Sequence, residues 1–240
     1  MLQSLPHPEP DIPVSEPRNP RAVVDLLAFG LFAVLMFLLM ALAMTRLTPI
    51  YVVPLQGVFN VALVGFIAVW LRTVRHVSFR EYVRLVPSHV IPTRKLIKLG
   101  TFLAAAVSIV SVFLPVVPPT PLERFLNSPG AIFLFVLFGV AVAPFTEELL
   151  FRGFLFQVLR EIGGFRLAIV GSAVLFAAPH FAQLGENWGA GMLIFIVGST
   201  LSVIRYRTNS VIPSFVVHTS YNASLVLLSP LFTVLQKALR

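Results

Sequence analysis

The chain contains no cysteine, and it has few charged residues for its length. Of its 240 residues, 12% are Asp, Glu, Lys or Arg, and only ten are acidic. The absence of cysteine excludes disulfides and thiolate-ligated metal sites. Soluble domains carry about a quarter charged residues, so the shortage of charge argues against a soluble globular protein.

The chain is instead rich in hydrophobic residues. Hydrophobic residues make up 57% of the chain, and the mean hydropathy is +0.90. An uncharged apolar run of about 20 residues is long enough to cross a bilayer as a helix. We therefore predict an all-α fold, a polytopic transmembrane helical bundle of about seven spans. The expected spans are residues 26–45, 52–71, 99–117, 131–160, 167–181, 190–204 and 211–228.

Two terminal segments differ from the spans in composition. Residues 1–21 contain six of the nineteen prolines among polar residues, a composition that cannot bury a core and predicts a disordered tail. Residues 229–240 are too short to cross the membrane, and we expect them to lie along its interface. Between these ends we expect three N-terminal transmembrane helices at 22–130 and a second helical unit at 131–228.

The formal net charge is +8, and its distribution indicates a membrane partner. A basic loop between two spans sets topology and contacts anionic lipid headgroups, so we do not expect nucleic-acid binding. This loop is predicted at 72–98 and holds seven of the eighteen basic residues: Arg72, Arg75, Arg80, Arg84, Arg94, Lys95 and Lys98.

The same loop charges predict the orientation of the chain. By the positive-inside rule, the N-terminus and the 72–98 loop are cytoplasmic, in a multi-pass protein of the plasma membrane. Lys237 and Arg240 disagree with this topology, because seven complete crossings would place them outside. Either the seventh segment does not cross fully, or the last helix returns.

Two adjacent glutamates, Glu147 and Glu148, lie inside one of the apolar runs. Burying a carboxylate among Val, Phe and Leu is unfavourable, and ionisable residues inside spans usually serve a function. Glu148 and Arg152 are four residues apart, so they share a helix face and can form an ion pair. We predict that this pair is structural, whereas Glu147 points about 100° away around the helix and has no such partner.

Three other polar residues are expected at the depth of Glu147. Glu147, His180 and His218 lie 13, 14 and 11 residues from the nearest loop arginine along their own helices. At helical rise these separations correspond to roughly 16–20 Å. Asn222 follows His218 by four residues and shares its face. We therefore expect the four side chains to form one site inside the membrane, between helices.

These residue types suit the hydrolysis of an acyl bond. Glu147, buried and unpaired, is a candidate general base that takes a proton from water and returns it. His180 can hold the same water. His218 and Asn222 can both donate hydrogen bonds, which suits the oxyanion of a tetrahedral intermediate. A water activator facing an oxyanion binder predicts a hydrolase.

Three short patterns resemble those of the CPBP family, which comprises the type II CAAX prenyl endopeptidases and bacteriocin-processing proteins. The resemblance extends over residues 131–228 and implies an all-helical intramembrane endopeptidase. It implies a membrane-associated peptide or protein substrate, either CAAX-type prenylated or bacteriocin-like. It also implies water activation by Glu147 and His180, and oxyanion stabilisation by His218 and Asn222. The matching residues are Glu147, Glu148 and Arg152, then Phe176 and His180, then His218 and Asn222.

Zinc is an alternative to this metal-free mechanism. Glu147, His180 and His218 are ligand types that zinc accepts, and the resemblance brings a metalloprotease label. However, the sequence has no His-Glu-x-x-His helix, and the positive charge of Arg152 would oppose a cation. We therefore expect no cofactor and retain zinc as the alternative.

Two functions other than proteolysis are also considered. A proton-coupled transporter uses membrane-embedded Glu, His and Arg, but such transporters commonly show repeated halves, and the sequence shows no repeat. A non-catalytic immunity or scaffold protein could keep this fold without using the site. Asn222 alone could serve as a link between helices, and Gly171 and Gly198 as close helix contacts.

Overall fold

In the computed structural model, residues 19–44, 51–114, 129–184 and 187–238 are described, and the regular structure in these ranges is entirely helical. Six helical stretches within them are long and apolar enough to cross a membrane. The predicted all-α transmembrane bundle is therefore confirmed. Most of the expected disordered tail lies outside the described residues. At its end the prediction was wrong, because a helix begins at Pro20.

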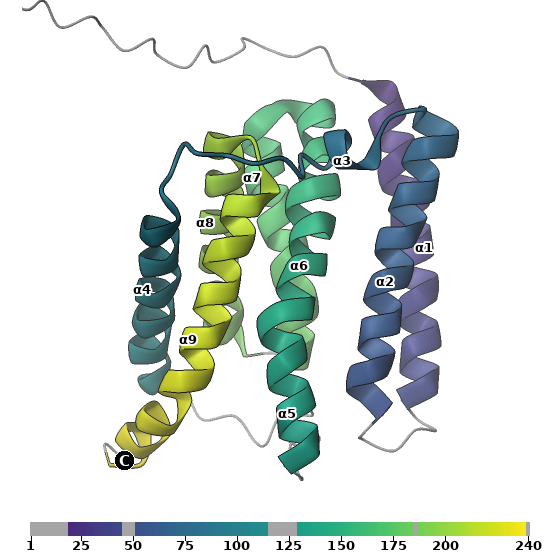
Figure 1. Ribbon diagram of the computed structural model, residues 1–240. Helices are drawn as coiled ribbons and strands as arrows, with labels where there is room; N and C mark the ends of the chain where they lie inside the picture. The colour runs from purple at the N-terminus through teal and green to yellow at the C-terminus, as the bar shows by residue number, and fades with distance from the viewer. Residues whose placement is uncertain (1–18, 45–50, 115–128, 185–186, 239–240) are drawn as a thin grey trace, which may run out of the picture.

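The longest of these stretches contains two crossings. It runs from Pro129 to Phe181, and its backbone leaves helical geometry at Gly163 and Gly164. Gly164 has a φ of 78°, a left-handed conformation that glycine adopts without steric penalty. Figure 1 shows the chain turning at this point and running back beside itself. The fourth and fifth expected spans are therefore separated by a tight glycine turn.

Six longer helices and several short helical segments make up the described part of the bundle. Two π-helical segments, η4 and η5, interrupt the run that leads to the glycine turn. The elements are α1 (Pro20–Met44), α2 (Val52–Trp70), η2 (Leu71–Arg75), α3 (Phe79–Tyr82), α4 (Thr93–Val112), α5 (Pro129–Leu137), η4 (Phe138–Val142), α6 (Ala143–Glu147), η5 (Glu148–Leu155), α7 (Phe156–Gln183), α8 (Trp188–Thr208) and α9 (Val211–Ala238).

The helices form three groups across the width of the molecule. In Figure 1, α1 and α2 lie side by side at one edge, and α4 and α9 pack together toward the other. The run from α5 to η5 lies between these pairs, with α7 and α8 packed behind it. The segment that carries Glu147 and Glu148 is thus central in the bundle.

Some boundaries differ from the expected ones. Helix α4 begins at Thr93, inside the predicted basic loop, because a helix can continue beyond the membrane on charged residues. Helix α9 continues through Ala238 with Pro230 inside it, so residues 229–238 prolong the last span rather than form a separate element. Their place at the membrane interface stays a prediction.

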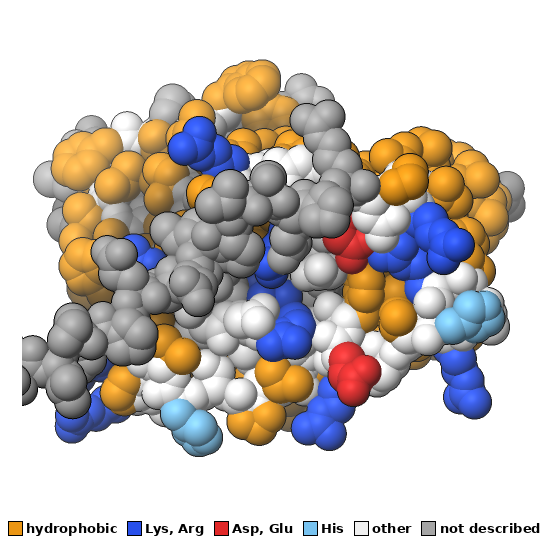
Figure 2. Space-filling model, turned by 90° about the horizontal axis from the view of Figure 1, so that it is seen from above, with side chains coloured by type: hydrophobic (Ala, Val, Ile, Leu, Met, Phe, Trp, Pro, Cys, Tyr) orange, Lys and Arg blue, Asp and Glu red, His pale blue; other side chains and the backbone are white. Residues whose placement is uncertain are grey.

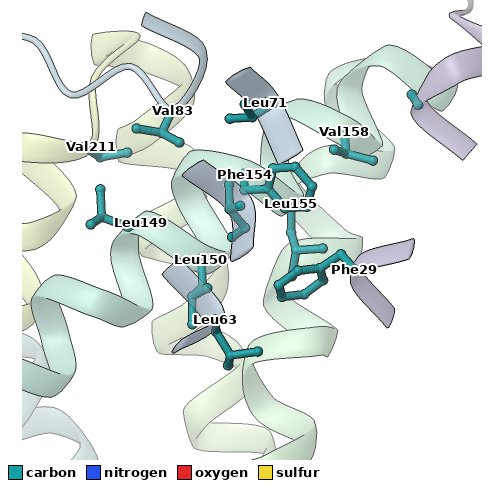
Figure 3. Close-up of a cluster of buried hydrophobic side chains, with 12 residues drawn as sticks. Phe29, Leu63, Leu71, Val83, Leu149, Leu150, Phe154, Leu155, Val158 and Val211 are labelled. Carbon is teal, nitrogen blue, oxygen red and sulfur yellow. The ribbon is translucent and has the colours of Figure 1, made fainter. Parts of the chain in front are cut away.

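An apolar cluster joins α1 and α2 to η5 (Figure 3). Phe29 of α1 packs with its ring centre 5.2 Å from that of Phe154, and Leu63 of α2 and Leu71 of η2 are buried in the same cluster. Lipid tails are as apolar as these side chains, so close packing rather than removal from water holds such helices together. The cluster fixes the side of η5 that faces the N-terminal helices.

Lys and Arg side chains gather at one end of the bundle, which we call the basic end. It comprises the 72–98 segment, the turn at 160–166 and the turn at 205–210. Figure 2 looks down on this end and shows many basic side chains and few acidic ones. The basic loop predicted from the sequence is therefore gathered with the other basic turns on one face.

An ion-pair cluster at the basic end ties α1 and α2 to α7. Arg75 lies with its Nε 3.3 Å from Asp25 Oδ2 and also bonds Glu161. The indole nitrogen of Trp70 donates to Asp25 Oδ1 at 2.9 Å. Tyr82 accepts a bond from Arg75 at 3.4 Å, and burial raises the pKa of its phenol, as does the nearby Glu161 carboxylate. These contacts link three helices whose residues are far apart in sequence.

Helix α4 packs closely on the backbone of α9 through Gly100. A Cβ atom at Gly100 would lie 2.5 Å from the carbonyl oxygen of Val217 and 2.9 Å from the backbone nitrogen of Tyr221. Backbone atoms cannot give way as a flexible side chain can. Because these atoms flank His218 on α9, Gly100 sets the distance between α4 and the turn that carries this histidine.

We predict that Gly100→Ala forces α4 and α9 apart and destabilises the protein. Overpacking of this kind costs about 1–3 kcal/mol, which corresponds to a fall in Tm of roughly 2–12 °C for a chain of this size. Thermal unfolding in detergent measures the effect. Gly65→Ala is the control, because nothing lies within 4 Å of a Cβ there. Equal losses in the two variants would contradict the close-approach explanation.

Candidate active site

Glu147 and Glu148 lie where the hydrogen-bonding pattern of the helix changes. Helix α6 has only five residues between η4 and η5, and Pro144 in its first turn has no N–H to donate. Glu147 is the last residue of α6, and Glu148 is the first of η5. Single π-helical turns inside α-helices occur frequently at functional sites. The sequence predicted one continuous helix here and gave no sign of these turns.

Glu148 and Arg152 form a buried ion pair. Arg152 Nη1 lies 3.1 Å from Glu148 Oε1, and the two side chains are 0% and 1% exposed. Arg152 Nη2 donates to the carbonyl oxygen of Gly198 at 2.9 Å, and its guanidinium carbon lies 4.3 Å from the ring centre of Phe176. An opposite charge and added hydrogen bonds offset part of the loss of hydration. The structure thus places these residues in the pairing expected from their spacing.

His218 contacts both glutamates. Its Nδ1 lies 3.0 Å from Glu148 Oε1, and its Nε2 lies 3.7 Å from Glu147 Oε2. A carboxylate accepts hydrogen bonds, so Nδ1 carries a proton and donates to Glu148. Nε2 of His218 faces Glu147, whose side chain is 21% exposed and the more accessible of the two carboxylates.

His180 lies beside His218 but bonds elsewhere. Its Nδ1 is 2.8 Å from the carbonyl oxygen of Phe176, one turn earlier. The Phe176 ring centre lies 4.7 Å from the His180 ring and 5.6 Å from the His218 ring. The Phe176 ring therefore contacts both histidines. Because Nδ1 donates to a carbonyl, the neutral imidazole of His180 has its lone pair on Nε2.

Asn222 links α9 to η4. Its Nδ2 donates to the carbonyl oxygen of Gly139 at 2.7 Å. An amide nitrogen has two N–H groups, so this bond leaves one donor for another acceptor. Asn222 lies one turn beyond His218 on the same helix. The structure brings Glu147, Glu148 and His218 into direct contact, with His180 packed next to them through Phe176 and Asn222 one turn away.

The zinc alternative needs three protein ligands around one position. Within the described ranges, no group of three His, Cys, Asp or Glu side chains is close enough to hold a metal ion. His180 donates from Nδ1 to a backbone carbonyl, which leaves its Nε2 available and is common in histidines that bind metals. Glu148, the neighbour of Glu147, is bound to the guanidinium of Arg152. Because no three of the described candidate ligands converge, these side chains, as they lie here, do not fit a catalytic zinc site.

Sequence reasoning missed three residues that support the site. Asn60 of α2 donates to the hydroxyl of Thr146, next to Glu147, at 3.1 Å. Arg205 of α8 is fully buried and donates from Nε to the carbonyl oxygen of Arg152 at 2.9 Å. Asn60 was detectable as an amide in an otherwise apolar run. Arg205 comes directly after the sixth expected span, so its position gave no sign of burial, and only the packing of α8 on η5 shows its contact.

Residues 129–224 match the family model described as type II CAAX prenyl endopeptidase Rce1-like. The match shows that this range, which we call the Rce1-like segment, is similar to that family. It confirms the resemblance predicted from the three motifs, and all seven motif residues lie within the Rce1-like segment. The segment is less than half of the chain and does not include α1, α2 or α4. No curated protein and no solved structure matches the chain.

The Rce1-like segment and the helices together define a broad class. Proteins of this family are proteases, and the chain has six helical stretches able to cross a membrane. It is an integral multi-pass membrane protein with a segment similar to a protease family, and this similarity points to a membrane-associated substrate within the bilayer.

Proposed function

We propose that the protein is an intramembrane endopeptidase in which Glu147 activates the water that hydrolyses a peptide bond. The contact of His218 with both glutamates carries this proposal. One glutamate is neutralised by Arg152, and the other is left to accept a proton. Residues with such different surroundings can take different roles although they are adjacent in sequence.

The proposed reaction begins with proton transfer from water to Glu147. The resulting hydroxide attacks the scissile carbonyl, and the negative charge on its oxygen is stabilised by N–H donors. The proposed donors are the second N–H of Asn222 and Nε2 of His218, whose ring is proposed to carry a proton on both nitrogens. The C–N bond then breaks, and Glu147 returns its proton to the departing amine. The water supplies one hydrogen to each product, so the reaction is balanced without a metal.

The remaining side chains orient the reacting groups. Glu148, fixed by Arg152, holds Nδ1 of His218 and so determines which nitrogen faces Glu147. His180 is oriented by its bond to the carbonyl oxygen of Phe176, and its Nε2 is the proposed second contact for the attacking water. A group that orients a catalytic imidazole fixes both its tautomer and its direction.

The proposed substrate is a membrane-associated peptide, either CAAX-type prenylated or bacteriocin-like. We further propose that the basic end faces the cytoplasm and the anionic leaflet of the plasma membrane, because basic residues are retained on that side. A prenyl chain would partition into the bilayer and bring the attached peptide to the membrane.

A cleavage assay tests the proposed activity. We expect purified protein in lipid vesicles to cut a prenylated peptide ending in a CAAX motif, seen by mass spectrometry as a new carboxyl terminus. The same peptide without the prenyl group should be cut at least about tenfold more slowly, since a lipid anchor raises its local concentration at the membrane. A non-catalytic scaffold predicts no cleavage of these peptides or of a bacteriocin leader peptide by folded protein.

Metal chelation distinguishes the glutamate mechanism from the zinc alternative. If Glu147 is a general base, a strong zinc chelator should leave kcat within about twofold of its starting value, because no step requires a metal. The measurement is the cleavage rate before and after dialysis against the chelator. Loss of activity that zinc restores would contradict this expectation and would make the glutamates and histidines ligands instead.

A further inference from the structure

Helix α2 contributes a buried polar contact to the segment of Glu147, although α2 lies outside the Rce1-like segment. Asn60 and Thr146 are both buried, and the Asn60 amide nitrogen lies 3.1 Å from the Thr146 hydroxyl oxygen. Gln56 donates to the other end of the Asn60 amide, at 3.2 Å. Burying an amide in apolar surroundings is unfavourable unless both of its ends are bonded, and here both are.

The Thr146 hydroxyl is the junction between the two helices. Its oxygen lies 3.0 Å from the carbonyl oxygens of Val142 and Ala143, so its proton is donated back to its own helix. The hydroxyl oxygen is then left to accept the bond from Asn60. These bonds together fix the rotation of α6 relative to α2, one residue before Glu147.

The short α6 segment is held from the side by α2 and by α9, where the ring centres of Phe145 and Phe215 lie 5.5 Å apart. It lies between two π-helical segments, in which the regular bonding pattern of an α-helix is replaced. Side chains of a helix point in directions about 100° apart for successive residues. Rotation of α6 about its own axis would therefore move the Glu147 carboxylate away from His218. The 3.7 Å contact between their side chains therefore depends on what holds α6 from the side.

We propose that Asn60 is a positioning residue for Glu147, acting through the hydroxyl of Thr146. The inference rests on the proposed function, in which Glu147 takes a proton from the attacking water. It assigns α2 a role in catalysis, because α2 fixes the base while the histidines are held by α7 and α9. Asn60 itself touches no reacting atom.

The kinetic test uses substitutions that keep the shape of the contact. Asn60→Leu and Thr146→Val each remove the bond with little change in volume, and each should lower kcat about tenfold with KM within twofold. The double variant should lose no more than the worse single variant, because both remove the same bond. The control is Val61→Ala, at an exposed position of α2. Losses that multiply in the double variant would overturn the proposal.

A second test needs no protease activity. The chain has no cysteine, so a single Glu147→Cys reports the exposure of this position to a maleimide. We expect Asn60→Leu to change the labelling rate at least about threefold, and Val61→Ala to leave it unchanged. Equal rates would overturn the positioning role even if the protein is a protease. Failure of wild-type protein to cut any peptide would instead count against the proposed function and leave the labelling result intact.

Discussion

Glu147→Gln should abolish cleavage. Glutamine has the same shape as glutamate but cannot take a proton from water, and loss of a general base lowers kcat by about 10²–10⁴-fold. The fold should survive, because Glu147 is the partly exposed carboxylate and lies outside the Glu148–Arg152 pair. Steady-state cleavage and thermal unfolding of the same preparation measure the two expectations together.

A matched substitution elsewhere tests whether the loss is specific. Glu81→Gln makes the same chemical change on an exposed residue of α3 and should leave kcat unaltered. If Glu147→Gln retained more than a tenth of the wild-type rate, Glu147 would not be the base. The glutamate mechanism would then have to be abandoned.

Arg152→Met should cause the largest loss of stability. Methionine fills much of the space but leaves Glu148 as a buried carboxylate without its counter-charge. Breaking a buried ion pair by removing one partner costs about 3–5 kcal/mol, a fall in Tm of roughly 6–20 °C for a chain of this size. Thermal unfolding in detergent measures it, and Arg166→Met, at an exposed arginine of the glycine turn, should unfold like wild type.

A double variant identifies the cause of that loss. Adding Glu148→Gln to Arg152→Met removes the unpaired charge, so the double variant should be more stable than Arg152→Met alone. We expect the double variant to be inactive, because Glu148→Gln removes the carboxylate that orients His218. If the double variant were no more stable than the single one, uncompensated charge would not be the reason.

Hydropathy and short motifs were enough to predict the broad architecture. A membrane-spanning helix needs a long uncharged run, and such runs can be counted in a sequence without knowing how the helices pack. The Glu148–Arg152 contact was also predictable, because it lies within one helix face. The turn at Gly163 and Gly164 lies between the two basic residues that separate the fourth and fifth spans.

Contacts between helices were not predictable in the same way. Spacing placed Glu147, His180 and His218 at one depth, but depth does not say which histidine faces the glutamate. The structure places His218 in contact with Glu147, a pairing that the sequence did not predict, and the water shared by Glu147 and His180 stays a prediction. The pairing follows from helix rotation and separation, which depend on π-helical turns and on Gly100. Neither leaves a periodic signal in the sequence.

The ion-pair cluster at the basic end has a consequence for how the chain is made. Asp25 and Arg75 neutralise each other within the α1–α2 hairpin, which is synthesised before the rest of the chain. Glu161, the second partner of Arg75, emerges from the ribosome 86 residues later. Its carboxylate, like the hydroxyl of Thr146 opposite Asn60, thus meets a polar partner on helices that were made first.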